Sequence, residues 1–233
     1  MKSYAEQLLH LVSSALDEIA CEHQKGKLAN TPVSNTNFLL RWITKSIKQQ
    51  RFSTLMAKDL LAWQKQGRSK GSNTEIYSRF VTIREFYSHF FHDFDYDQPI
   101  LDTQINQWID FMETVNWSVC TEYDLSGDGR GQLFTQGDSS LVLCAHQCDD
   151  CFEGGTNDDG TERLMKPMSF YVRGNHAQFI ELATRAGFML HKQTDYKSKV
   201  KYHGEYLIYP NNLGTQLAEI PIGFNPENYQ NQD

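Results

Sequence analysis

The sequence contains no apolar run of the roughly 20 residues that a membrane-spanning helix requires. Charged side chains interrupt its first residues, which therefore lack the continuous apolar segment of a secretory signal. Its 233 residues include five cysteines, three of them between positions 144 and 151. An odd number distributed in this way does not form the disulfide framework of a small secreted protein. We therefore expect a cytoplasmic protein with no membrane segment.

Familiar catalytic signatures are missing as well. No phosphate-binding loop ending in Gly-Lys-Ser/Thr, no Gly-x-Ser-x-Gly elbow and no His-Glu-x-x-His helix occurs. The turn predicted at Gly127–Gly131 has the wrong glycine spacing for a dinucleotide loop, and it lies between strands rather than before a helix. The sequence thus identifies no catalytic residue. It does not decide whether the protein is an enzyme, and it favours a non-enzymatic protein.

What the sequence does contain predicts an α+β fold, beginning with a helical part. Ser3 and Glu6 have the spacing of a capping box at a helix start. Apolar residues at helical spacing then predict helices over 3–25, 36–50, 54–66 and 74–91. Trp42 and Trp63 lie on the apolar stripes of neighbouring helices, so we predict that both are core residues.

The hydrophobic period changes after about residue 100. A helix is predicted at 103–115 and another at 175–186. Strands are predicted at 117–123, 132–135, 140–146, 168–173, 188–196 and 200–209. These elements fit a small antiparallel or mixed sheet with two helices packed on it.

The predicted domain organisation has three parts. We predict a helical domain over 1–98, an α+β domain over 99–224 and a flexible tail over 225–233. The boundary is set by the segment Asp93–Pro99, which is acidic and ends in proline. Within the helical part, Gly67–Asn73 has the composition of a flexible basic linker.

Charge is unevenly distributed, although the net charge is only −7. Residues 25–72 contain ten basic residues and one acidic residue, whereas residues 73–166 contain five basic and eighteen acidic residues. We call residues 25–72 the basic block. Arg41, Lys45 and Lys48 recur at the i, i+4, i+7 spacing that places them on one helix face.

A helical surface with this charge is typical of contact with a phosphate backbone. The candidate nucleic-acid or anion contacts are Arg41, Lys45, Lys48, Arg51, Arg68, Lys70 and Arg173. Arg173 is included because it precedes a predicted helix start, where free backbone N–H groups attract anions. The alternative is that the basic block pairs with the acidic middle of the same chain.

The segment from Cys144 to Cys151 gives a second candidate site. If the predicted strand at 140–146 continues, Cys144, His146 and Cys148 alternate onto one of its faces. The Cys148–Cys151 spacing allows two thiolates to bind one tetrahedral zinc. These four side chains are therefore candidate zinc ligands. Alternatively Cys144 is a core residue and the other two are ordinary thiols near a turn, which a single Cys-x-x-Cys pair favours.

Seven short stretches together resemble an uncharacterised gammaproteobacterial family known as a domain of unknown function. The stretches are Thr31-Pro-Val-Ser-Asn35, Lys48-Gln-Gln-Arg-Phe52, Gly67-Arg-Ser-Lys-Gly71, Gln147-Cys-Asp-Asp-Cys151, Lys166-Pro-Met168, Val172-Arg-Gly-Asn-His176 and Tyr202-His-Gly-Glu-Tyr206. The resemblance spans most of the chain. It implies a bacterial cytosolic protein, and it implies no activity, cofactor or catalytic residue.

Three functional hypotheses follow. The first is a non-enzymatic regulatory or binding protein that contacts nucleic acid or an acidic partner through its basic helical surface. The second is an enzyme of unknown reaction that uses the cysteine and histidine cluster at 144–151, with or without zinc. The third is a protein-interaction adaptor whose charged segments pair only with each other. The sequence indicates no oligomeric state.

Overall fold

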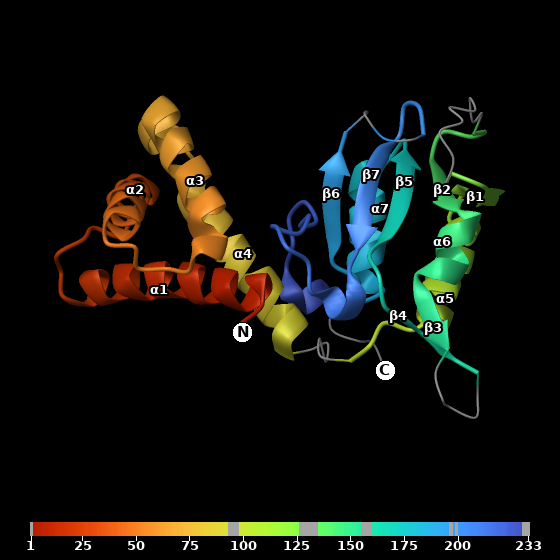
Figure 1. Cartoon of the computed structure of the whole chain (residues 1–233). Helices are drawn as coiled ribbons and strands as arrows, with labels where there is room; N and C mark the ends of the chain where they lie inside the picture. The colour runs from red at the N-terminus through yellow and green to blue at the C-terminus, as the bar shows by residue number, and fades with distance from the viewer. Residues whose placement is uncertain are drawn as a thin grey trace. The chain divides into compact units, whose positions relative to one another are not determined.

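The computed structural model describes residues 2–92, 98–125, 135–154, 160–195, 198 and 200–229. The chain forms two compact units (Figure 1). One unit, which we call the helical unit, consists of Met1–His92 together with Phe224–Asp233. The other, the α+β unit, consists of Asp93–Gly223. Helices followed by a mixed sheet confirm the predicted α+β class. The sequence predicts a domain boundary between residues 98 and 99. Residues 93–97 of the predicted boundary segment lie outside the described residues.

The helical unit is built from α1 (Tyr4–Gln24), α2 (Pro32–Lys48), α3 (Ala57–Lys70) and α4 (Ile76–His92), with 3-10 turns at Thr54–Met56 and Gly71–Asn73. Ser3 and Glu6 form the predicted capping box at the start of α1. The two tryptophans are core residues as predicted, because Trp42 is 5% exposed and Trp63 3% exposed. Trp63 packs edge-on against Phe80 of α4, with ring centroids 4.8 Å apart.

The second helix begins four residues earlier than predicted. Its N-cap is Thr31, whose hydroxyl accepts a hydrogen bond from the Ser34 N–H at 3.2 Å. Pro32 occupies the first helical position, where the N–H that proline lacks would have no partner within the helix. Residues 32–35, which precede the predicted helix, therefore form the first turn of α2.

The third helix runs past Gly67, where the sequence predicted its end. Gly67 is buried, and a Cβ atom at this position would lie 2.3 Å from Leu40 Cδ2 on α2. The missing side chain therefore lets α3 approach α2 closely rather than ending the helix. The helix ends at Gly71, whose φ of 56° disfavours other residues. The predicted flexible linker at Gly67–Asn73 is thus wrong, because helical turns occupy it.

The C-terminal segment of the helical unit packs on α4. Phe224 lies 5.2 Å from Phe86 and Tyr229 lies 5.9 Å from His89, measured between ring centroids. Residues Pro226–Tyr229 form a 3-10 turn in which Tyr229 is buried. The sequence predicts a flexible tail from residue 225, and the described part of that tail contributes the buried Tyr229 side chain. Residues 230–233 lie outside the described residues.

The α+β unit contains a five-stranded mixed sheet (Figure 1). Its strand order is β1 (Ser118–Tyr123), β2 (Ser140–Cys144), β5 (Met168–Arg173), β7 (Gly204–Ile208) and β6 (Leu190–Thr194). The β1–β2 pair is parallel and the other pairs are antiparallel. The helices α5 (Asp102–Thr114) and α7 (His176–Arg185) contribute Trp108 and Phe179 to a core that includes Phe170 of β5. The predicted sheet with two packed helices is confirmed.

Three elements of this unit were not predicted. The chain turns at Cys144 into the short helix α6 (Ala145–Asp150), and β3 (Phe152–Gly154) pairs with β4 (Glu162–Leu164). The predicted strand at 140–146 therefore ends two residues early. The predicted turn at Gly127–Gly131 and residues 132–134 of the next predicted strand lie outside the described residues.

Candidate functional site

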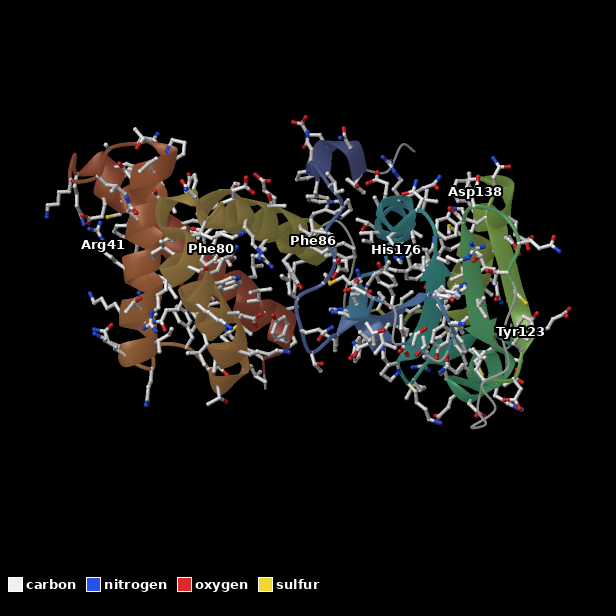
Figure 2. The ribbon with its side chains drawn as sticks, turned by 90° about the horizontal axis from the view of Figure 1, so that it is seen from above. Arg41, Phe80, Phe86, Tyr123, Asp138 and His176 are labelled. Carbon is white, nitrogen blue, oxygen red and sulfur yellow. The ribbon has the colours of Figure 1, made fainter. Side chains whose placement is uncertain are left out.

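The helix α2 presents a row of cations on its solvent side. Arg41, Lys45 and Lys48 are exposed, whereas Leu39 and Ile43 of the same helix are buried. Figure 2 shows Arg41 at the periphery of the helical unit. At 1.5 Å of rise per residue, the three side chains span about 10 Å along the helix. The amphipathic pattern of α2 thus produces the basic face expected from its sequence spacing.

These cations border a groove between α2 and α3. The groove has a volume of about 460 Å³ and is lined by Leu40, Arg41, Thr44, Lys45, Lys48, Gln64, Gly67 and Arg68. The lining contains four cationic side chains and no carboxylate. At its centre Gln64 Nε2 donates a hydrogen bond to Thr44 Oγ1 at 3.3 Å. Sequence reasoning missed Thr44 and Gln64, because neither stands out until two helices bring them together.

The four cations of this groove have no carboxylate partner among the described residues. Other members of the basic block do have one. Arg51 pairs with Glu18 of α1, and its guanidinium carbon also lies 5.2 Å from the centroid of the Trp42 ring. Lys25 pairs with Glu22 at 3.1 Å. The structure therefore separates the candidate contacts into engaged side chains, such as Arg51, and unengaged ones around the groove.

Two further candidate contacts lie away from this groove. Lys70 is exposed at the last turn of α3 and is not part of the groove lining. Arg173, at the end of β5, donates hydrogen bonds to Thr135 Oγ1 at 3.1 Å, to Thr135 O at 3.2 Å and to Gly137 O at 2.9 Å. Arg173 thus holds the segment before β2 in place, which accounts for its donors without an anion.

The cysteine and histidine cluster has a different geometry from the one the sequence suggested. Because α6 replaces the end of the predicted strand, Cys144, His146 and Cys148 do not alternate on one strand face. Among the described residues, no group of three His, Cys, Asp or Glu side chains is placed to hold a metal ion. The Cys151 thiol donates to Pro167 O at 3.7 Å, and His146 Nε2 lies 3.3 Å from Asp124 Oδ2.

Two thiols of this cluster also have raised pKa values. Burial raises the pKa of both the Cys148 and the Cys151 thiol. A raised pKa disfavours the thiolate, which is the form that attacks electrophiles. Neither the zinc hypothesis nor the enzyme hypothesis at 144–151 therefore gains support from this geometry.

A buried hydroxyl–imidazole pair in the α+β unit was missed by sequence reasoning. His203 Nδ1 lies 2.9 Å from Lys201 O and donates to that carbonyl. In the neutral ring Nε2 is then an acceptor, 3.1 Å from Ser140 Oγ, whose hydroxyl also lies 3.0 Å from Thr135 Oγ1. Burial lowers the pKa of His203, which favours this neutral form. Ser140 and His203 are 0% and 1% exposed. No substrate reaches a pair buried to this degree, so we interpret it as a structural link between β2 and the start of β7.

A family model described as "Protein of unknown function (DUF2913)" matches residues 3–221. The chain belongs to this family. The match covers both units and confirms the resemblance to a domain of unknown function. No curated protein and no solved structure matches the chain. Among the described residues, no helix is long and apolar enough to cross a membrane.

Proposed function

We propose that the protein is a non-enzymatic binding protein that contacts the phosphate backbone of nucleic acid through the groove between α2 and α3. The observation that carries this proposal is the lining of the groove, which combines two polar side chains with four cations that have no carboxylate partner in the described part of the chain. Clustered unpaired cations repel one another, so a site of this kind is most stable when an anion is bound. We further propose that the protein acts in the bacterial cytoplasm, where nucleic acid is accessible.

The composition of the groove favours nucleic acid over an acidic protein. Protein interfaces are usually anchored by aromatic side chains that fill pockets on the partner. The groove contains no aromatic residue, and Leu40 is its only aliphatic side chain larger than a methyl group. Backbone contacts made by Arg, Lys, Thr and Gln position a protein on nucleic acid but carry no sequence information. We therefore expect binding that does not depend on base sequence.

The test compares two triple variants in fluorescence-anisotropy titrations with a short DNA duplex of random sequence. Contacts from four cations give a slope of about −3 to −4 in a plot of log affinity against log salt concentration. Arg41→Gln/Lys45→Gln/Lys48→Gln should reduce the slope to about −1, since only Arg68 remains. The matched control is Lys27→Gln/Lys58→Gln/Lys65→Gln, which removes three exposed basic-block charges outside the groove lining.

The control triple should keep most of the slope and affinity of the wild type. Equal losses in the two triples would show that only the general charge of the basic block matters, and not this groove. No binding by the wild-type protein at low salt would refute the proposal. In that case the adaptor hypothesis becomes the better explanation of the basic surface.

A further inference from the structure

A second groove lies on the opposite flank of α2, against α1. Its volume is about 470 Å³, within the range of roughly 300–1,000 Å³ typical of small-molecule sites. It is lined by side chains of α1, of α2 and of the connection that follows α2. Its lining includes Cys21, Phe38, Arg41, Trp42, Lys45 and Arg51. The proposed nucleic-acid contact does not require this groove.

The charges of this groove leave an unneutralised positive end. Its two carboxylates, Glu18 and Glu22, are already paired with Arg51 and Lys25. Arg41 and Lys45 complete the lining and have no carboxylate partner among the described residues. The groove therefore attracts an anion at the end formed by Arg41 and Lys45.

Trp42, which lines the groove, carries a buried hydrogen-bond donor that is not used within the described part of the chain. Trp42 is 5% exposed, and its Nε1 is buried without a partner among the described residues. Trp108 Nε1 in the core of the α+β unit is also without a partner among the described residues, whereas Trp117 Nε1 of that unit donates to Gln178 Oε1 at 3.1 Å. A buried donor without an acceptor typically costs about 1–3 kcal/mol. A ligand that brings an acceptor into the groove removes this cost, and the half-buried Phe38 offers an apolar surface beside it.

We infer that the groove between α1 and α2 binds a small organic phosphate. The phosphate group contacts Arg41 and Lys45, an oxygen or nitrogen acceptor receives the Trp42 N–H, and the uncharged body lies against Phe38. A bare anion lacks the last two contacts, and an uncharged molecule lacks the first. The groove should therefore prefer a molecule that combines the two parts.

Occupation of this groove should also affect the proposed nucleic-acid surface, a consequence that rests on the proposed function. Arg41 and Lys45 line both grooves. A side chain that turns towards a phosphate ester on the α1 flank no longer neutralises a backbone phosphate on the α3 flank. The small ligand and the nucleic acid should therefore compete, although they occupy different grooves.

Cys21 provides a local probe of binding. It is exposed and lines the groove between α1 and α2, whereas the other four cysteines are buried or half-buried. Adenosine monophosphate should slow the alkylation of Cys21 by a maleimide, read by mass spectrometry of the peptide that contains it, with half-buried Cys120 as the internal reference. Adenosine alone and inorganic phosphate alone should protect Cys21 at least about tenfold more weakly, since each lacks one part of the ligand.

Variants separate the ligand contact from a general loss of structure. Trp42→Phe keeps an aromatic ring but removes the N–H, and should weaken protection by adenosine monophosphate about fivefold. Trp63→Phe is the control, because Trp63 is equally buried in the same unit but lines neither groove. The inference is overturned if adenosine monophosphate leaves the alkylation rate of Cys21 unchanged. Equal protection by inorganic phosphate alone, or equal effects of the two tryptophan variants, also overturns it.

The competition is tested separately in the duplex titration. Adenosine monophosphate should weaken duplex binding by the wild type, and less so by Trp42→Phe, at constant ionic strength. Protection of Cys21 without any duplex binding would refute the proposed function and leave the small-molecule site intact. Duplex binding without protection of Cys21 would refute the small-molecule site and leave the proposed nucleic-acid contact intact.

Discussion

The two units use their polar side chains in opposite ways. In the helical unit, cations such as Lys45 and Arg68 lie exposed around a groove and have no carboxylate partner among the described residues. In the α+β unit, several polar side chains turn inward and bind one another, although Trp108 Nε1 and both ring nitrogens of His191 are buried without a partner among the described residues. Ser169 donates to Glu205 at 2.9 Å, and His176 Nδ1 lies 2.8 Å from the Tyr206 hydroxyl.

This difference indicates where a partner can bind. A buried polar group that already has a hydrogen-bond partner contributes to the specificity of the fold and offers nothing to a ligand. An exposed cation without a carboxylate partner contributes little to folding stability and can contact an anion instead. We therefore propose that the binding surface lies in the helical unit, and we interpret the polar pairs of the α+β unit as structural.

The largest expected effect tests whether each unit has a core of its own. Trp63→Ala removes a buried indole from the helical unit, and such truncations typically cost about 3–5 kcal/mol of unfolding free energy. Trp108→Ala is the matched change in the α+β unit, where Trp108 is also 3% exposed. Hydrogen exchange should show each loss of amide protection mainly within the altered unit. Equal losses in both units from either change would show that they unfold as one.

The second effect is a loss of stability in acid that should be specific to the α+β unit. His191 is 1% exposed, and burial lowers its pKa to about 4, outweighing the opposite effect of the nearby backbone of Gln216 and Leu217. In the unfolded chain this imidazole titrates near 6.5. Between these two pH values the unfolded chain binds a proton that the folded protein does not. Its contribution to stability is thus complete above about pH 6.5 and is lost as the pH falls.

The size of this loss follows from the shift in pKa. At 1.36 kcal/mol per pH unit, it approaches about 3 kcal/mol near pH 4. Urea unfolding from about pH 7 to pH 4 measures it, and His191→Gln should make the dependence on pH shallower. An unchanged pH dependence in this variant would show that His191 is not the responsible group. Burial also lowers the pKa of His176 and His203, which act in the same direction.

Sequence reasoning succeeded where the determining interactions are local. The Ser3–Glu6 capping box spans three residues, and the apolar stripe that buries Trp42 repeats within one helix. The common face of Arg41, Lys45 and Lys48 was predictable for the same reason, since helix geometry alone fixes it. The α+β class followed from the change in hydrophobic period near residue 100.

It failed where a distant part of the chain decides the outcome. Glycine commonly ends a helix, but Gly67 lies inside α3, where its missing side chain leaves room for Leu40 of α2. Arg173 resembles an anion contact in sequence, but Thr135 and Gly137 take its donors. The pairing of Ser140 with His203 joins residues 63 positions apart. The groove itself was not predictable, because it exists only where α2 and α3 pack.

The smallest expected effect on stability concerns Gly67, where fold and proposed function meet. In Gly67→Ala the new methyl would lie 2.3 Å from Leu40 Cδ2, which is the mobile end of a half-buried side chain and can move aside. Alanine also favours the helix by about 1 kcal/mol relative to glycine. These effects oppose each other, so unfolding free energy should change by less than about 1 kcal/mol.

Displacing Leu40 should nevertheless narrow the groove and weaken duplex binding severalfold. The double variant Gly67→Ala/Leu40→Ala restores the space and should recover most of that affinity. A large loss of stability in the single variant would show that Leu40 cannot move. Unchanged duplex binding in the single variant would mean that the phosphates contact the cations without entering the groove, so that the basic face of α2 alone forms the interface.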